Sequence, residues 1–381
     1  MAASHESPSV EQLENYPPKP YSQTGFSDGN RSKMTTIAPL VLLLSVWIPG
    51  LGQKEDIEVI KARAEAGDVS AVMLLADAFD HGSGVEIDMV QAAYWYMKAA
   101  EAGNPEAQSI IGTKMRLGEG IRKDHKEAVS WYRKSAKQGN ANAMFNLGTA
   151  YYNGEGEAIN DSNALAWFIA AQAFGSDKAP DAVQRGFAEL NRVKLADGLI
   201  KAAYMFVSGN EIPERPETAV EYLKKAMDAG RKDASIMLAE LYLAGKGVPK
   251  DAKAAAEYCS QAAKSNYTRA YFCLGQLYRT GEGEPKDPAK AAFWYGKAAR
   301  CGDIDGLYMM GRLYGRGEGV KKDRILQYAM LMLAHKIPEA QEEAAQIKAQ
   351  LSDKDLRKAK KKAGAFVQKL DPRCVAPALL K

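Results

Sequence analysis

A fixed spacing between similar glycine turns and aromatic pairs constrains this chain more than any other feature of its sequence. The turn Gly154-Glu155-Gly156 is followed by the aromatic pair Trp167-Phe168. A similar turn, Gly118-Glu119-Gly120, and a similar pair, Trp131-Tyr132, stand 36 residues earlier. A period between about 20 and 50 residues is typical of repeat proteins, in which each unit buries its apolar faces against its neighbours. The period therefore predicts a stacked array rather than a set of independent domains.

Seven units of 36 residues can be written in one register, and they begin at Gly67, Gly103, Gly139, Lys194, Gly230, Asn266 and Gly302. We therefore predict repeats one to three within residues 53–174 and repeats four to seven within residues 194–337. Residues 175–193 are expected to form a helical interruption, because this segment begins like a repeat and lacks the glycine turn. The sequence does not decide whether the interruption is a hinge or a rigid wedge. Residues 338–381 are expected to form a capping helix and a basic tail, which cover the last open helix face.

Each unit is predicted to contain two helices joined by the glycine turn. In repeat three, apolar or small residues at Ala143, Leu147, Ala150 and Tyr151 have helical spacing and define a first helix, helix A. The glycines of the turn end helix A, because glycine adopts the positive φ angles that close helix ends and tight loops. The second helix, helix B, starts after an aspartate that can cap it. This aspartate recurs at Asp88, Asp124, Asp251, Asp287 and Asp323.

The packing between helices A and B is also visible in the sequence. Small residues in helix A allow the two helices to approach closely, and they stand at Gly112, Gly148, Gly275 and Gly311. Large aromatic residues of helix B fill the space on the other side, and they stand at Trp95, Trp131, Trp167, Tyr222, Tyr258 and Trp294. Because no unit can bury both of its faces alone, the units must stack.

The recurring pattern resembles that of Sel1-like repeats. Repeat six carries Leu274-Gly275, Gly281-Glu282-Gly283, Asp287 and Trp294-Tyr295 at the phase of that family, and repeat four departs from it with Asn210-Glu211 in place of the second glycine. The resemblance implies an all-α fold, a right-handed α/α solenoid of helix-turn-helix repeats similar to tetratricopeptide repeats. It also implies a non-enzymatic adaptor or assembly scaffold, and exported bacterial members commonly work in the envelope or at the host interface.

The N-terminal segment has the composition of an export signal preceded by an extension. Residues 1–33 are polar, and we predict that they are disordered. Residues 34–52 combine a basic flank, the apolar run 37–48 and the exit Gly50-Leu51-Gly52, which is typical of a secretory signal peptide. Met34 would then be the true start, and the protein would be exported, periplasmic or secreted. The alternative is a short uncleaved membrane anchor through residues 37–48.

Four cysteines, Cys259, Cys273, Cys301 and Cys374, match no metal or redox spacing. In an exported protein, a disulfide between Cys259 and Cys273 would join consecutive helices. Buried free thiols are the alternative, and it is the one that the sequence slightly favours.

No catalytic, cofactor or metal site is predicted. The net charge of +4 is too small to indicate nucleic acid as a partner of the whole chain, and the basic C-terminal segment is interpreted as a solvated helix face. The glycine turns follow helices rather than strands, so they do not indicate a dinucleotide site. Gly245-Lys246-Gly247 lacks the strand and the following Ser or Thr of a phosphate loop. The alternative to a scaffold is a cell-wall-related hydrolase of the Sel1-repeat β-lactamase-like type.

The predicted partner-binding surface is a stripe on helix A, which we name the helix-A stripe. Positions separated by three, four and three residues share one face of a helix, and the residues of this face change in type from unit to unit. By analogy with tetratricopeptide repeats, the stripe should line the concave surface, where aromatic and Arg side chains suit a peptide or protein ligand. The alternative is that the rings of Phe145, Phe272 and Tyr308 belong to the core between helices. The stripe consists of Asn142, Phe145, Thr149, Tyr152, Arg269, Phe272, Gln276, Arg279, Tyr308 and Arg312.

Overall fold

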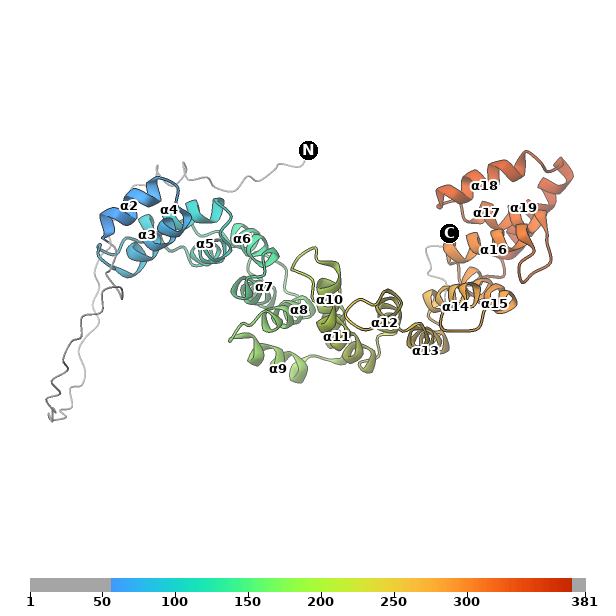
Figure 1. The fold of residues 1–381 in the computed structure, drawn as a ribbon, viewed down its shortest axis with the longest axis horizontal. Helices are drawn as coiled ribbons and strands as arrows, with labels where there is room; N and C mark the ends of the chain where they lie inside the picture. Colours follow the sequence, from blue (N-terminus) through green and yellow to red (C-terminus); the bar gives the residue numbers. More distant parts are fainter. Residues whose placement is uncertain (1–55, 372–381) are drawn as a thin grey trace. The chain divides into compact units, whose positions relative to one another are not determined.

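The computed structural model describes residues 56–371, and these residues contain eighteen helices and no strand (Figure 1). The predicted all-α class is thereby confirmed. The expectations for residues 1–33 and 34–52 lie outside the described residues. The described chain forms two compact units, of which one runs to Asn146 and includes Glu155–Ala158, and the other comprises Leu147–Gly154 and the residues from Ile159 onward.

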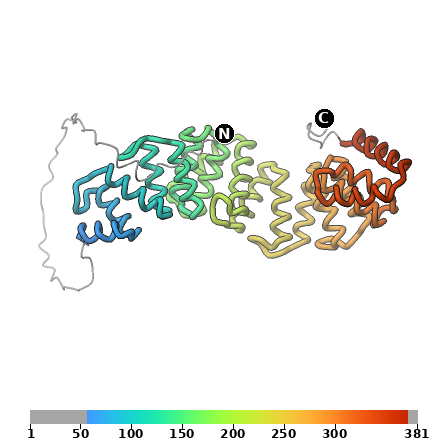
Figure 2. The backbone as a smooth tube through the Cα atoms, turned by 90° about the horizontal axis from the view of Figure 1, so that it is seen from above, coloured from blue at the N-terminus to red at the C-terminus, as the bar shows by residue number. Residues whose placement is uncertain are grey.

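The helices follow one another as antiparallel pairs, which the tube in Figure 2 shows as successive reversals of the chain. The helix α2 (Ile57–Glu65) precedes the repeats, and α9 (Ala179–Glu189) stands alone after the third pair. The seven pairs are α3 (Val69–His81) with α4 (Met89–Glu101), α5 (Pro105–Leu117) with α6 (His125–Lys137), α7 (Ala141–Asn153) with α8 (Asp161–Ala173), α10 (Arg192–Ser208) with α11 (Pro216–Asp228), α12 (Lys232–Ala244) with α13 (Ala252–Lys264), α14 (Thr268–Thr280) with α15 (Pro288–Arg300), and α16 (Ile304–Arg316) with α17 (Arg324–Leu333). The chain then continues as α18 (Pro338–Lys348) and α19 (Asp353–Val367).

The helix boundaries follow from the capping residues that the sequence identified. The Asp124 carboxylate accepts hydrogen bonds from the backbone N–H groups of Lys126 and Glu127, both at 3.0 Å. The other four aspartates cap α4, α13, α15 and α17 in the same way. At the end of α14, Gly281 adopts a φ of 83°, and its N–H donates to the carbonyl of Leu277. The first glycine of the turn therefore ends helix A, as predicted.

The second glycine of the turn has a role that the sequence did not indicate. A Cβ atom added at Gly283 would come closer than 3.0 Å to the carbonyl group of Ala252, the first residue of helix α13 in the preceding repeat. Gly120 meets the backbone of Met89 in the same way, and Gly319 meets that of Pro288. The second glycine is therefore the point at which each turn docks on the preceding helix B.

Helices A and B of one repeat approach closely at the small residues of helix A, as predicted. A Cβ added at Gly112 would lie 2.8 Å from the ring of Tyr132, and one added at Gly275 would lie 2.6 Å from the ring of Tyr295. Both tyrosine side chains are fully buried. The contact at the glycine is thus made by the second residue of the aromatic pair.

The interruption is a packed helix within the second unit. Both α9 and α10 pack against α8. The Leu165 side chain of α8 lies between them, because a Cβ added at Gly186 or at Gly198 would lie 2.7 or 2.9 Å from its methyl carbons. The small residues in α9 and α10 therefore allow both of these helices to pack against α8, the second helix of repeat three.

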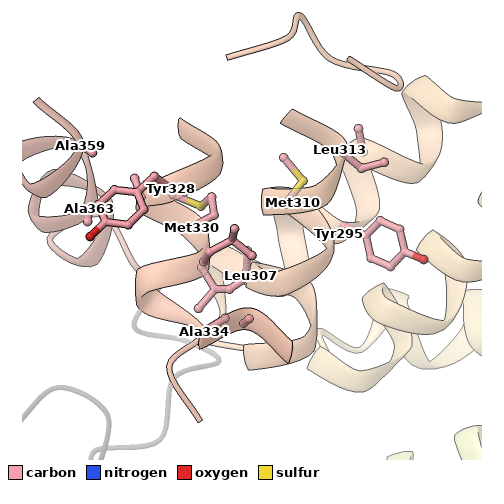
Figure 3. Close-up of a cluster of buried hydrophobic side chains, with 14 of the residues drawn as sticks. Tyr295, Leu307, Met310, Leu313, Tyr328, Met330, Ala334, Ala359 and Ala363 are labelled. Atoms are coloured by element: carbon pink, nitrogen blue, oxygen red, sulfur yellow. The ribbon is translucent and has the colours of Figure 1, made fainter. Parts of the chain in front are cut away.

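The C-terminal helices cover the last repeat. Ala340 of α18 and Ala359 and Ala363 of α19 are buried in one cluster with Tyr328 and Leu331 of α17. Figure 3 shows Ala363 beside Tyr328. The basic residues of α19 are exposed, and they are Lys354, Arg357, Lys358, Lys360, Lys361 and Lys362. As far as Val367, the expected basic tail is therefore a second capping helix, with exposed basic side chains of which Lys362 pairs with Asp323, the capping residue of α17, at 3.1 Å.

The cysteines correct one sequence expectation. Cys259 of α13 and Cys273 of α14 form a disulfide, with Cα atoms 6.1 Å apart. Cys301 is disulfide-bonded as well. The favoured prediction of free thiols is therefore wrong for these three residues. For Cys259 and Cys273 the reason is that the stacking of the consecutive helices α13 and α14 brings them within the Cα distance that a disulfide requires.

Among the described residues, no helix combines the length and apolar character needed to cross a bilayer.

The docking role of the second glycine predicts a large effect of Gly283→Ala. The added Cβ collides with the backbone of Ala252, and the φ of 75° is unfavourable for Ala. We expect the free energy of unfolding to fall by about 2–5 kcal/mol, the sum of a left-handed backbone penalty and overpacking. Urea unfolding followed by circular dichroism measures the loss.

Gly103→Ala is the matched control, because Gly103 has a φ of 94° and no heavy atom within 4 Å of an added Cβ. It should cost only the backbone penalty, about 1–2 kcal/mol. Equal losses in the two variants would contradict the docking role.

Candidate partner-binding site

The helix-A stripe lies on three helices. Asn142 and Phe145 belong to the part of α7 in the first unit, and Thr149 and Tyr152 to its part in the second unit. The remaining six residues lie on α14 and α16, in the second unit. Four of the ten side chains are exposed, and they are Asn142, Tyr152, Arg269 and Gln276. The other six are half-buried.

The aromatic residues of α14 and α16 are partly core residues, as the structural alternative expected. The Phe272 ring packs against the buried clusters on both sides and lies 5.4 Å from the Tyr295 ring. Arg269 covers Phe272, with its guanidinium carbon 5.4 Å from the ring centroid. Arg312 covers Tyr308 similarly, at 5.6 Å. Each ring therefore contacts the core and also supports an arginine at the surface.

Polar contacts join helix A of one repeat to helix A of the next. Arg269 Nη1 lies 3.2 Å from Asp305 Oδ2, and Lys114 Nζ lies 2.5 Å from Asp80 Oδ1. Arg231 forms an ion pair with Asp197 in the same arrangement. The pair Arg269–Asp305 is half-exposed, so it contributes at most about 1 kcal/mol to stability. Of these residues, Arg269 is the one that the sequence assigned to a partner, and it already has a carboxylate within the chain.

The capping helix α18 occupies the stripe of repeat seven. The Tyr308 hydroxyl donates to Glu343 Oε1 at 2.9 Å, and Arg312 Nε lies 3.8 Å from the same oxygen. Glu343 was missed by sequence reasoning, although it stands 35 residues after Tyr308, close to one repeat period. The cap was expected to cover the last open helix face, and its contacts there include these polar ones to Tyr308 and Arg312.

Arg279 differs from the other two arginines of the stripe. Among the described residues, no carboxylate lies within ion-pair distance of it, whereas Arg269 and Arg312 each have one. Arg279 Nε and the hydroxyl of Tyr295 are both buried without a hydrogen-bond partner. Burial raises the pKa of Tyr295, and the nearby Arg279 guanidinium opposes that rise. The stripe therefore contains one cation without an internal counter-ion, on α14.

Tyr152 lies at a separate cavity that the sequence did not predict. The cavity has room for about 70 Å³ of solvent and is lined by residues that include Tyr152, Leu165, Phe168, Arg185 and Leu190. It is formed by the end of α7 together with α8 and α9. Because α9 does not belong to any repeat, the repeat pattern gave no signal for it.

The described residues contain no group of three or more His, Cys, Asp or Glu side chains that could hold a metal ion.

Seven segments of the chain match the Sel1 repeat family, and they are residues 69–104, 105–140, 141–171, 196–230, 232–267, 268–303 and 304–334. The chain belongs to this family. Sel1 repeat proteins are generally non-catalytic scaffolds for protein interactions. The α9 segment falls between the third and fourth matched Sel1 repeats, and α18 and α19 follow the seventh.

Three solved structures illustrate the similarity. A protective antigen of uropathogenic Escherichia coli strains with an SLR fold is 24% identical, with 84% of this chain and 88% of that chain covered and a TM-score of 0.34. A Sel1 repeat protein from Oxalobacter formigenes is 26% identical, with 69% and 96% covered and a TM-score of 0.38. The immunity protein Pa5087 from Pseudomonas aeruginosa is 18% identical, with 71% and 82% covered and a TM-score of 0.27.

No curated protein matches the chain. Because all three TM-scores lie below 0.5, the family assignment rests on the matched repeats and not on the superpositions.

Proposed function

We propose that this Sel1 repeat protein is a non-enzymatic scaffold that binds a peptide or protein segment on helix A of repeat six. The binding surface consists of Arg269, Phe272, Gln276 and Arg279, which we name the α14 patch. The observation that carries the proposal is the uncompensated Arg279 on a face where Arg269 and Gln276 are exposed. In repeat seven the corresponding face is covered by Glu343.

The α14 patch has the composition of a binding hot spot. Arginine and aromatic side chains dominate the energetics of protein interfaces, in particular where they are held by surrounding packing. Here the Phe272 ring is fixed by its contact with Tyr295, and Arg269 is held over that ring. A partner would therefore meet a surface that is already ordered, so it would lose less conformational entropy on binding.

We also propose that the protein is exported, in the bacterial envelope or outside the cell. The disulfide between Cys259 and Cys273 supports this location, because disulfides persist in oxidising compartments. The signal-like composition of residues 34–52 agrees with it. Retention through residues 37–48 as a membrane anchor is the alternative for the same segment.

The binding proposal predicts that the triple variant Arg269→Ala/Gln276→Ala/Arg279→Ala loses its partners. Arg269 and Gln276 are exposed and Arg279 is half-buried, and none of the three belongs to the buried apolar clusters, so their removal should leave the fold intact. In a pull-down from envelope extracts, we expect partners that wild type recovers to decrease at least about tenfold, since each hot-spot residue is worth about 2 kcal/mol or more.

The matched control is Lys253→Ala/Glu257→Ala/Gln261→Ala, which changes three exposed residues on α13. This control should recover the same proteins as wild type. Equal recovery by wild type and by the α14 patch variant would refute the binding proposal.

The export proposal predicts the N-terminus of the mature protein. Sequencing the N-terminus of protein isolated from the native envelope should give a start at or near Gln53, because cleavage follows the small residues at the end of the signal. Retention of the residues before Ile37 would instead support the membrane-anchored alternative.

A further inference from the structure

An arginine and a buried tyrosine recur as neighbours in two repeats. Arg116 accompanies Tyr132 in repeat two, and Arg279 accompanies Tyr295 at the same positions of repeat six. Both tyrosines are fully buried. In each case burial raises the pKa of the tyrosine and the arginine opposes the rise. The two repeats therefore contain the same structural element and can be compared directly.

In repeat two, this element is completed within the chain by a carboxylate. Arg116 Nη1 lies 3.7 Å from Oε2 of Glu155, the middle residue of the next glycine turn. The Tyr132 hydroxyl also has a partner, the hydroxyl of Thr113 at 3.1 Å. In repeat two the arginine thus has a carboxylate within ion-pair distance, although Glu155 Oε2 itself makes no hydrogen bond, and the tyrosine hydroxyl has a hydroxyl partner.

In repeat six, the corresponding partners are missing. Gln276 replaces Thr113, so the Tyr295 hydroxyl lacks the hydroxyl partner that Tyr132 has, and the Arg279 guanidinium is its polar neighbour. Glu318 is the equivalent of Glu155 in the next glycine turn, but it lies 3.7 Å from Arg316 Nη1. Arg279 therefore lacks the carboxylate that its equivalent in repeat two has.

The charges around Arg279 do not supply a replacement. Arg269 is paired with Asp305, and Arg312 is paired with Glu343. Every other arginine on this face of α14 and α16 thus has its own acidic partner among the described residues. Among the described residues, Arg279 therefore differs from these arginines in having no carboxylate within ion-pair distance.

We propose that Arg279 binds the side-chain carboxylate of a glutamate in the partner segment. The inference rests on the proposed function and specifies its ligand. The partner glutamate takes the place that Glu155 has beside Arg116, and the planar guanidinium suits a carboxylate in paired, charge-assisted hydrogen bonds. Tyr295 is a positioning residue, because its ring contacts Phe272 and its hydroxyl interacts with the Arg279 guanidinium. The neighbouring Phe272 ring suits an apolar residue next to that glutamate.

The test compares two short probes that differ in one group, the amidated peptides acetyl-Ala-Leu-Glu-Leu-Ala and acetyl-Ala-Leu-Gln-Leu-Ala. They are titrated into the full chain, while the arginine Nε–H signals are followed by NMR. We expect the Glu peptide to bind on the order of tenfold tighter than the Gln peptide, as for a hydrogen bond to a charged group. We also expect it to shift the signal of Arg279 and not that of Arg116.

Arg279→Gln should remove the preference for the Glu peptide. Arg116→Gln is the matched control, because Arg116 already has its carboxylate, and this variant should keep the preference. Tyr295→Phe retains the ring and Arg279, so it should weaken the preference a few-fold without abolishing it. The shift of the Arg279 signal in wild type tests the inference even if a variant fails to fold.

Three results would overturn the inference: equal affinity of wild type for the two peptides, no measurable binding of the Glu peptide, or a preference that survives in Arg279→Gln. Failure of the scaffold proposal has a different signature. In that case the Glu preference at Arg279 would persist, while the α14 patch variant would still recover every protein in the pull-down.

Discussion

The stacking of this protein depends on the contact between the second glycine of each turn and the first turn of the preceding helix B. At Gly283, Gly120 and Gly319 the two backbones are so close that a single Cβ atom would not fit. This contact fixes the distance from one repeat to the next without any side chain. Side chains at other positions can therefore vary while the spacing is preserved. Two repeats differ: the atom nearest to a Cβ added at Gly84 of repeat one is the Ile57 Cβ at 3.9 Å, and repeat four has Asn210-Glu211 in place of the second glycine.

The constant spacing between repeats explains why residues of the helix-A stripe pair with residues of the next repeat or of the cap. Residues about one repeat apart come close enough to pair, as Arg269 does with Asp305 and Tyr308 does with Glu343. Charged residues of this face such as Arg269 and Arg312 therefore have partners within the chain, and a ligand would have to compete with those partners. Arg279 stands out because its counter-ion is absent and the tyrosine beneath it has an unpartnered hydroxyl.

The sequence predicted those features that depend on local chemistry. Asp124 and its equivalents cap helix B, Gly281 ends helix A, and Gly275 leaves room for the Tyr295 ring. Each of these effects acts within one repeat, so it can be predicted from local sequence. Features that depend on contacts between repeats were missed or left open. The docking of Gly283 and the pairing of Glu343 with Tyr308 were missed, and the disulfide between Cys259 and Cys273 was only the less favoured alternative, because all three require knowing which residues the stacking brings together. For the same reason the sequence could not show that Arg269, Tyr308 and Arg312 of the ten-residue stripe have partners within the chain.

The central claim is that a partner binds helix A of repeat six, and hydrogen–deuterium exchange tests it most directly. The exchange of the full chain should be measured alone and with a partner recovered in the pull-down. Our account predicts slower amide exchange in α14, between Arg269 and Arg279, with helix B of the same repeat unchanged. Protection confined to helix B, or to the exposed basic face of α19, would contradict the account.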